Sequence, residues 1–301
     1  MDGIKRLVYG IYPRSDSLRI QISRWERKKV GTEDLRVEIR KEKEEIIEAF
    51  RTSSEFYTDP AVNWHDLFRP VVGLLDGVSF GRLERYMETN TFYRQPVINA
   101  LPTLRADFHE QAVEENLPPP VFQEDANSWL LLPSPYSFYR ASQDVAGIGF
   151  DKFSEAVFNA YEEIARTNGK SSIVLREIFP YDDSIPSSLG NLNGKFNVIL
   201  VTQGGIRKPA PGKFAGKFYS VVVQEEELGF VGEYSGIPGI PIIDAKNTRL
   251  ENTEQLRNRI EETRENLGER ELLITTNHHL DFLPRIIADR KLGILKSLGG
   301  Q

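Results

Sequence analysis

Eight short apolar segments alternate with charged or loop-like stretches, and this alternation limits the fold more than any other feature of the chain. The segments carry the Val, Ile, Leu and aromatic residues typical of buried strands and are 6–13, 55–60, 129–138, 173–180, 197–205, 219–230, 240–245 and 272–277. Apolar residues at helical spacing characterise four of the intervening stretches, 32–50, 154–169, 252–268 and 281–298. Strands that alternate with helices form a parallel sheet, and eight such units in 301 residues predict an α/β fold, the (β/α)8 TIM barrel.

One segment is too long for a simple barrel. Residues 61–128 lie between the second and third expected strands and exceed the length of one connecting helix. We expect a single barrel domain over 1–301, in which 61–128 form an insertion, part loop and part hairpin, over the C-terminal face. Residues 208–217, rich in Lys, Gly and Pro, predict a second loop.

Composition narrows the class of protein. The net charge of −6 argues against a nucleic-acid partner, and no apolar run approaches the roughly 18 residues that span a membrane. The N-terminus lacks a signal-peptide pattern, so we expect a cytoplasmic protein that does not act at a membrane. The absence of cysteine excludes disulfides, thiolate nucleophiles and zinc sites built on sulfur.

Polar residues at the ends of the expected strands are the first candidates for a site, because barrel enzymes place their working groups there. These candidates are Ser134, Glu177, Asp244, Asn277 and His278. Each also has a structural interpretation, since a polar residue at a strand end commonly caps a helix or holds a loop.

The insertion adds polar and aromatic groups that suit a ligand. The candidates from the insertion, together with the arginine that follows the first strand, are Arg14, Asp66, Arg69, Asn90, Tyr93 and Arg94. Arginine binds carboxylates or phosphates through paired hydrogen bonds, and tyrosine stacks on flat heterocycles. A structural role explains the same residues equally well, because ion pairs could hold the insertion against the barrel.

Two adjacent histidines, His278 and His279, end the eighth expected strand. Neighbouring residues of a strand point to opposite faces, so both reach one ion only if the chain has already turned. We therefore predict no metal site in this chain and expect His278 to line the barrel mouth with Asn277. His278 and Glu227 are the residues that would ligate a metal if one were bound.

Several stretches together resemble the cobalamin-independent methionine synthases. They are YGIYPRSDSLRIQISRWERKKVGTEDL, GRLERYMETNTFYRQPVI, PIIDAKNTRLENTEQLRNRI and TTNHHLDFLPRIIADRKLGIL, which span nearly the whole chain in the family's order. The chain looks most like a single-barrel archaeal homologue of the enzyme's N-terminal half. The resemblance implies a (β/α)8 barrel and a part in methionine biosynthesis, the methyl transfer from a methyl-pterin or another methyl donor to homocysteine. In that family zinc holds the thiol as a thiolate.

The zinc ligands of that family's catalytic barrel do not carry over. The family takes them from a His-x-Cys on strand five, a Glu on strand six and a Cys after strand eight. Strand five here reads VILVTQGG, and the last cysteine falls near His278. Phe179 replaces the glutamate that anchors homocysteine unless Glu177 substitutes for it, and the family's TDGE keeps only Thr58 and Asp59.

The resemblance therefore implies a zinc-free donor-binding or accessory barrel, which works with a separate zinc-bearing catalytic barrel of the same family. We expect zinc only in that partner chain and no tightly bound cofactor in this one, and we assign methyltransferase activity to the pair. Arg14, Arg69 and Arg94 are candidates for the donor's carboxylates and Tyr93 for stacking. Two alternatives stay open: a purely structural partner of the catalytic chain, and a corrinoid- or tetrapyrrole-using enzyme of the same superfamily.

Overall fold

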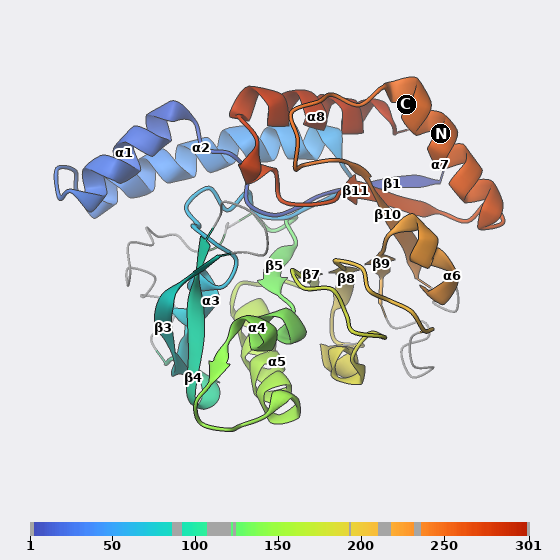
Figure 1. The fold of residues 1–301 in the computed structure, drawn as a ribbon. Helices are drawn as coiled ribbons and strands as arrows, with labels where there is room; N and C mark the ends of the chain where they lie inside the picture. Colours follow the sequence, from blue (N-terminus) through green and yellow to red (C-terminus); the bar gives the residue numbers. More distant parts are fainter. Residues whose placement is uncertain are drawn as a thin grey trace.

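Eight parallel strands form the central sheet of the protein (Figure 1). The computed structural model describes residues 3–85, 92–106, 122, 125–192, 194–209, 218–231 and 236–299. The strands are β1 Ile4–Val8, β2 Phe56–Tyr57, β5 Leu130–Pro133, β7 Ser172–Arg176, β8 Asn197–Val201, β9 Ser220–Val222, β10 Ile237–Ile243 and β11 Leu272–Thr276. Their order in the sheet is β2, β1, β11, β10, β9, β8, β7, β5. Each strand lies within or overlaps one of the eight predicted segments, so the predicted barrel fold is confirmed.

The sheet closes on itself between β2 and β5. The Trp129 amide donates to the Tyr57 carbonyl at 2.8 Å, and Thr58 and Trp129 form an isolated parallel bridge. By contrast, β7 pairs with β8 along five residues. The barrel is therefore closed, with one sparsely paired seam at β2 and β5.

Several strands end earlier than the apolar runs that predict them. The first strand stops at Val8, because Gly10 adopts a φ of +92° and turns the chain into a loop. The third barrel strand stops at Pro133, because Ser134 caps helix α4 (Pro135–Ala141) by accepting a hydrogen bond from the Ser137 amide at 3.1 Å. The apolar residues beyond a strand thus belong to the barrel mouth or to the next helix.

Helices cover the outside of the barrel, where α2 lies beside α8 (Figure 1). The long helices are α1 Asp16–Glu26, α2 Thr32–Ser53, α5 Phe150–Thr167, α7 Thr253–Asn266 and α8 Arg285–Ser297. The α2 helix buries Leu35, Ile39, Ile46 and Phe50, which lie at helical spacing. The α7 helix is capped by Asn252, the first residue of the predicted stretch 252–268. None of the helices in the described part of the chain has the length and apolar character needed to cross a membrane.

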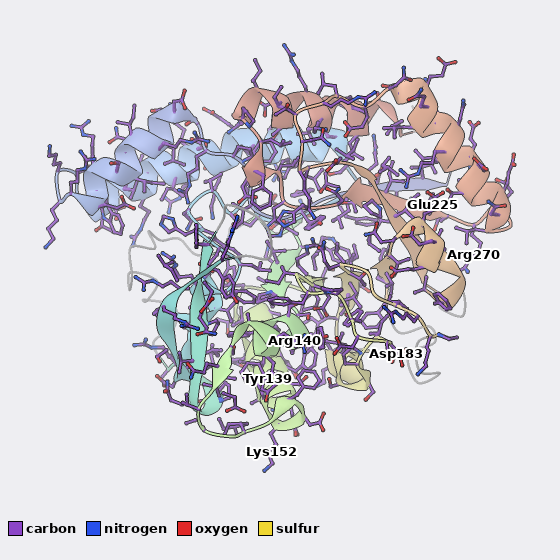
Figure 2. The ribbon with its side chains drawn as sticks, viewed as in Figure 1. Tyr139, Arg140, Lys152, Asp183, Glu225 and Arg270 are labelled. Atoms are coloured by element: carbon purple, nitrogen blue, oxygen red, sulfur yellow. The ribbon has the colours of Figure 1, made fainter. Side chains whose placement is uncertain are left out.

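A short helical segment ties the loop after β9 to the outer layer. The 3-10 helix Glu225–Glu227 leads into α6 (Leu228–Val231). Glu225 is labelled in Figure 2. Its carboxylate accepts hydrogen bonds from Arg259 at 2.7 Å and from Thr263 at 2.6 Å, both on α7. This contact holds the β9 loop against α7.

Residues between β2 and β5, together with a short strand after α4, form a second, smaller sheet beside the barrel (Figure 1). A short helix, α3 (Arg69–Val72), precedes the antiparallel pair β3 (Leu75–Arg85) and β4 (Phe92–Leu104), and β6 (Gln143–Asp144) adds to β4 in parallel. The proposed boundary of the insertion, 61–128, stays a prediction. Residues 86–91, 107–121 and 123–124 lie outside the described residues, as does the expected loop 208–217 beyond its first two residues.

A buried ion pair joins α2 to the end of the second strand. Lys43 Nζ lies 2.9 Å from Asp59 Oδ2, and neither side chain is more than 6% exposed. Asp59 also accepts the Ala61 amide at 2.6 Å. Burial lowers the pKa of Lys43, and the Asp59 carboxylate acts against this shift.

Candidate functional site

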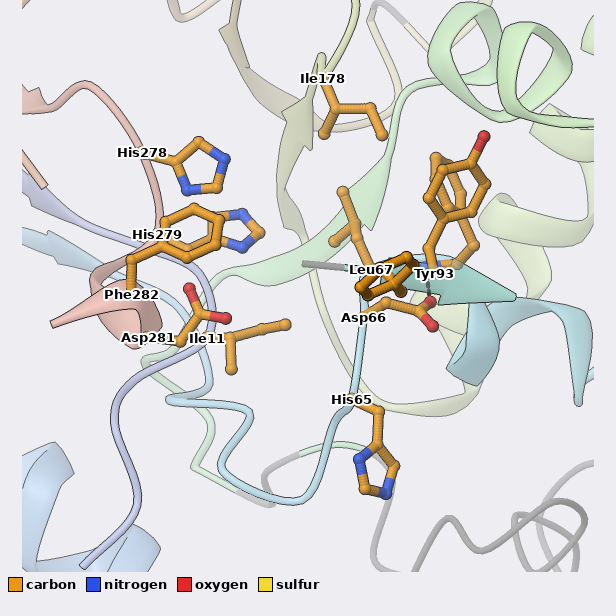
Figure 3. A pocket seen from close by; sticks show the side chains of 12 residues that line it. Ile11, His65, Asp66, Leu67, Tyr93, Ile178, His278, His279, Asp281 and Phe282 are labelled. Atoms are coloured by element: carbon orange, nitrogen blue, oxygen red, sulfur yellow. Dashed lines mark hydrogen bonds between the residues drawn. The ribbon is translucent and has the colours of Figure 1, made fainter. Parts of the chain in front are cut away.

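A pocket of about 490 Å³ opens at the C-terminal ends of the barrel strands. Its lining comes from the loops after β1, β2, β7 and β11 and from the start of β4: Ile11, His65, Asp66, Leu67, Phe68, Phe92, Tyr93, Ile178, His278, His279, Asp281 and Phe282. Figure 3 shows the side chains of the β11 loop on one wall, with Asp66 and Tyr93 opposite. Its position at the C-terminal ends of the barrel strands is where such barrels place their binding sites.

The loop after β11 brings three potential metal ligands together. One nitrogen each of His278 and His279 and a carboxylate oxygen of Asp281 all lie within 4.8 Å of one another. The strand ends at Thr276, whose hydroxyl donates to the His278 carbonyl at 2.7 Å. The two histidines therefore follow a turn, and the divergence expected of neighbours within a strand does not apply to them.

Burial determines the protonation of this cluster. It lowers the pKa of His279 to about 3, with a further contribution from the charge of Arg176. Burial also holds the pKa of His278 well below its usual value and raises the pKa of Asp281 to about 7, against the opposing effect of backbone amides and Arg14. At pH 7 both imidazoles are therefore neutral, and each ring carries one unprotonated nitrogen.

A glycine on the β1 loop makes room for His279. A Cβ atom at Gly10 would lie 2.3 Å from His279 Cδ2, and the φ of +92° also favours glycine. On its other side the His279 ring stands edge-on to Tyr9, with 5.7 Å between the ring centroids. The β1 loop thus fixes where this ring can lie.

Asp66 organises the opposite wall. Its carboxylate accepts the amides of Phe68 at 2.9 Å, of Arg69 at 2.7 Å and of Arg94 at 3.3 Å, and Arg69 Nε lies 3.4 Å from it. Burial raises the pKa of Asp66, and the Arg69 charge opposes that shift. Tyr93 packs against Phe68, with 5.4 Å between ring centroids. The Asp66 contacts therefore fix the backbone that presents Tyr93 to the pocket.

Two of the three predicted donor-binding arginines donate to backbone carbonyls. Arg14 donates to the carbonyls of Val62 and, at 2.7 Å, of Trp64, and Arg94 donates to the Gly81 carbonyl at 3.2 Å. Among the described residues that line the pocket, none is an arginine.

A second, polar hollow of about 460 Å³ adjoins the pocket. The two share Ile11, His65 and Asp281, and Arg14 and the exposed Arg19 line the second hollow. A ligand in the pocket would therefore have guanidinium groups within reach at one edge.

Glu177 and Ser134 belong to a buried network behind the pocket lining. Hydroxyl groups of Ser137 and, at 2.6 Å, of Tyr181 donate to the Glu177 carboxylate. Burial raises the pKa of Glu177, and hydrogen bonds from Ser134, Ser137 and Tyr181 lower it. Both predicted residues are fully buried, and neither lines the pocket.

The remaining strand-end candidates join neighbouring loops. Asn277 accepts the Ala245 amide at 2.8 Å and donates to Asp244 at 2.9 Å. Glu227 accepts the Ile206 amide at 2.9 Å and lies outside the pocket lining. The other candidate, Asn90, lies outside the described residues.

No family model matches the chain, and no curated protein matches it in sequence. Solved structures do resemble it. The structure of a B12-independent methionine synthase from Shewanella sp. W3-18-1 in complex with selenomethionine matches with a TM-score of 0.65 and 13% identity, over 90% of this chain and 89% of that one. The barrel has the fold of a methionine synthase structure. A putative vitamin-B12 independent methionine synthase from Listeria monocytogenes matches with a TM-score of 0.61 and 14% identity, over 97% and 96% of the two chains.

The thiol-activating zinc of the methionine synthases does not fit the end of β8. The residues after this strand are Thr202 and Gln203, and Arg176 donates to the Thr202 carbonyl at 3.0 Å and to Gln203 Oε1 at 2.7 Å. The Thr202 hydroxyl donates to the Val222 carbonyl at 2.9 Å. A guanidinium group therefore lies beside the strand end to which the resemblance assigns metal ligands.

Sequence reasoning did not select Asp281, Phe282 or Phe92 as site residues. Asp281 and Phe282 fall in the stretch predicted as the last helix, 281–298. In the structure this helix, α8, starts only at Arg285. The spacing His-His-x-Asp directly after a strand was the available signal for Asp281. The apolar lining has no comparable signal, because Phe92 and Phe282 resemble any surface or core aromatic in sequence.

Proposed function

We propose that this chain is a methionine synthase-like barrel that supports methyl transfer from a methyl-pterin to homocysteine in the cytoplasm. In this proposal it binds the methyl donor and works with a separate zinc-bearing barrel. The fold similarity to methionine synthase structures, over about nine-tenths or more of both chains, supports the family assignment. The observation that supports the donor-binding role is the pocket lined by aromatic residues, with the second, polar hollow that contains Arg14 and Arg19 beside it.

The two hollows match the two halves of a methyl-pterin that carries an acidic tail. Phe92, Tyr93 and Phe282 line the pocket, and aromatic side chains stack on flat heterocycles. Arg14 and Arg19 line the adjoining hollow, where they suit carboxylates. We therefore place the ring in the pocket and the carboxylate tail in the hollow.

Thiol activation is assigned to the partner barrel. The Arg176 guanidinium lies where the resemblance would put metal ligands of the catalytic barrel, and the chain has no cysteine. Homocysteine therefore needs a zinc-bearing chain to become a thiolate. This chain supplies a shaped site for the donor.

A binding measurement tests the stacking role. Phe92 is 54% exposed, so Phe92→Ala should leave the fold intact while weakening binding of a methyl-pterin by about 3- to 10-fold, the worth of one aromatic contact. The matched control is Leu83→Ala, which changes a residue that is 56% exposed on β3 and lies outside the pocket. Titration calorimetry on the chain, alone and mixed with a zinc-bearing barrel, gives the affinities.

A second pair of variants tests the tail. Arg19→Ala should weaken binding of a pterin with carboxylates and leave a tail-less pterin unaffected, because Arg19 lines only the second hollow. Arg24→Ala, an exposed arginine on the same helix, is the control. No measurable methyl-pterin affinity in either setting contradicts the donor-binding role.

The second sheet favours one other function, a purely structural partner. Leu83, Leu101 and Val145 are apolar and 48–56% exposed on this sheet or directly after it, and exposed apolar groups are typical of docking surfaces. Activity of the mixed barrels that persists in Phe92→Ala, without donor binding by this chain, would favour that function.

A further inference from the structure

The loop after β11 presents two buried polar atoms that donor stacking does not explain. His279 Nε2 and Asp281 Oδ1 are buried, and neither has a hydrogen-bond partner among the residues that the structure describes. Most buried polar atoms in proteins are hydrogen-bonded, so such atoms call for a ligand or another partner. Both side chains line the pocket, together with His278 (Figure 3).

The chemistry of the three side chains matches that of a metal site. Two imidazole nitrogens and one carboxylate oxygen lie within 4.8 Å of one another. This combination binds zinc and other divalent first-row metal ions, with positions left for a ligand or water.

We propose that His278, His279 and Asp281 bind one divalent transition-metal ion, zinc by the type of its ligands, with its remaining coordination positions open to the pocket. The ion differs from the thiol-activating zinc of the methionine synthases, because all three ligands come from one loop and none from the ends of β8 or β9. Its existence does not depend on the proposed function. It replaces the expectation from the sequence that this chain binds no metal.

The spacing of the ligand atoms is close to what an ion needs. Tetrahedral zinc with bonds of about 2.0–2.2 Å places its ligand atoms roughly 3.3 Å apart, so binding would draw the most distant pair together by about 1.5 Å. Side-chain rotation in a loop can supply that movement. The contact of His279 with Gly10 limits where the ring can go, and we expect His278 and Asp281 to move more.

Nearby positive charges oppose the ion and limit its affinity. Arg176 acts on both histidines, Lys246 acts on His278, and Arg14 acts on Asp281. The Arg176 guanidinium already donates to three carbonyl oxygens and the Gln203 side chain, which partly offset its charge. The Asp281 carboxylate contributes the negative charge, so we expect a dissociation constant below about 10 μM, weaker than that of sulfur-rich zinc sites.

An ion at this position would act on whatever ligand the pocket takes. Its open positions face the space between the β11 loop and Tyr93 (Figure 3). A bound cation polarises an oxygen or nitrogen of a ligand and fixes its orientation. Tyr93 and the ion would then contact opposite sides of the same molecule.

Metal titration of the full chain tests the proposal without any methyl donor. After treatment with a chelator, we expect one equivalent of Zn²⁺ in calorimetry and one equivalent of Co²⁺ with visible ligand-field absorption. His279→Gln and Asp281→Asn should each weaken binding at least tenfold. His65→Gln, which removes a pocket histidine outside the cluster, should bind like the wild type, and circular dichroism checks that each variant is folded.

Two results overturn the proposal. One is the absence of saturable Zn²⁺ and Co²⁺ binding by the wild-type chain up to about 100 μM metal, ten times the expected limit. The other is wild-type affinity in both His279→Gln and Asp281→Asn. If His279→Gln does not fold, Asp281→Asn and the wild-type stoichiometry still decide. Because no pterin is present, loss of the metal site and loss of the donor-binding role are distinguishable.

Discussion

Gly10→Ala tests whether the β1 loop positions the β11 cluster. At a φ of +92° an L-residue is strained by about 1–2 kcal/mol. The added methyl group would also lie 2.3 Å from His279 Cδ2 and 2.7 Å from Cγ, and overpacking of this kind costs about 1–3 kcal/mol. We therefore expect a total loss of roughly 2–5 kcal/mol in the free energy of unfolding.

A matched control separates the steric clash with His279 from the backbone strain. Gly147 also has a positive φ, +65°, but nothing lies within 4 Å of an added Cβ, so Gly147→Ala should lose only about 1–2 kcal/mol. Urea unfolding followed by circular dichroism measures both variants. Equal losses, with unchanged metal binding in Gly10→Ala, would refute the view that Gly10 holds the His279 ring in place.

Three further predictions concern the barrel itself. Asp59→Asn leaves Lys43 buried without its carboxylate partner and should lower the free energy of unfolding by about 3–5 kcal/mol. Adding Lys43→Met to this variant should restore most of that loss. A wild-type urea midpoint for Asp59→Asn would contradict this. Because burial raises the pKa of Glu177 above 4.5, its stabilising contribution is complete below pH 4.5 and is lost as the pH rises through the folded pKa. The wild type should therefore lose stability relative to Glu177→Gln as the pH rises above 4.5, and parallel stability curves would disprove the shift. Asn252→Ala removes the cap of α7, where Asn252 accepts the Gln255 amide at 3.0 Å, and should lower stability by about 1 kcal/mol, whereas Asn252→Asp should keep it in the same thermal melts.

The barrel could be predicted because its strands are buried on both faces and therefore read as short apolar runs. The ends of the strands could not. Ile11 and Tyr12 are as buried as strand residues but lie in the loop after β1, because Ile11 lines the pocket and Tyr12 packs against Phe50. Hydropathy reports burial, and only hydrogen-bond geometry separates the last strand residue from the first loop residue.

The candidate site was predictable only in part. The rule that barrels work at strand ends selected His278, which lines the pocket. Asp281 joins the cluster only because the chain turns after Thr276, and nothing in the local sequence fixes that turn. The choice of Arg69 and Arg94 followed side-chain chemistry alone, whereas their bonds to Asp66 and to the Gly81 carbonyl depend on how the hairpin packs.

The barrel's sparse closure between β2 and β5 has a consequence for how ligands exchange. The hairpin that carries Tyr93 is inserted between these two strands in the sequence, and the Trp129 amide donates a hydrogen bond across the seam. Transient parting of the two strands would shift one wall of the pocket while the β11 wall stays anchored between β1 and β10. Opening of the seam and entry of the ligand would then be one motion. Occupancy of the pocket would slow deuterium uptake at the Trp129 amide, although Trp129 does not line the pocket.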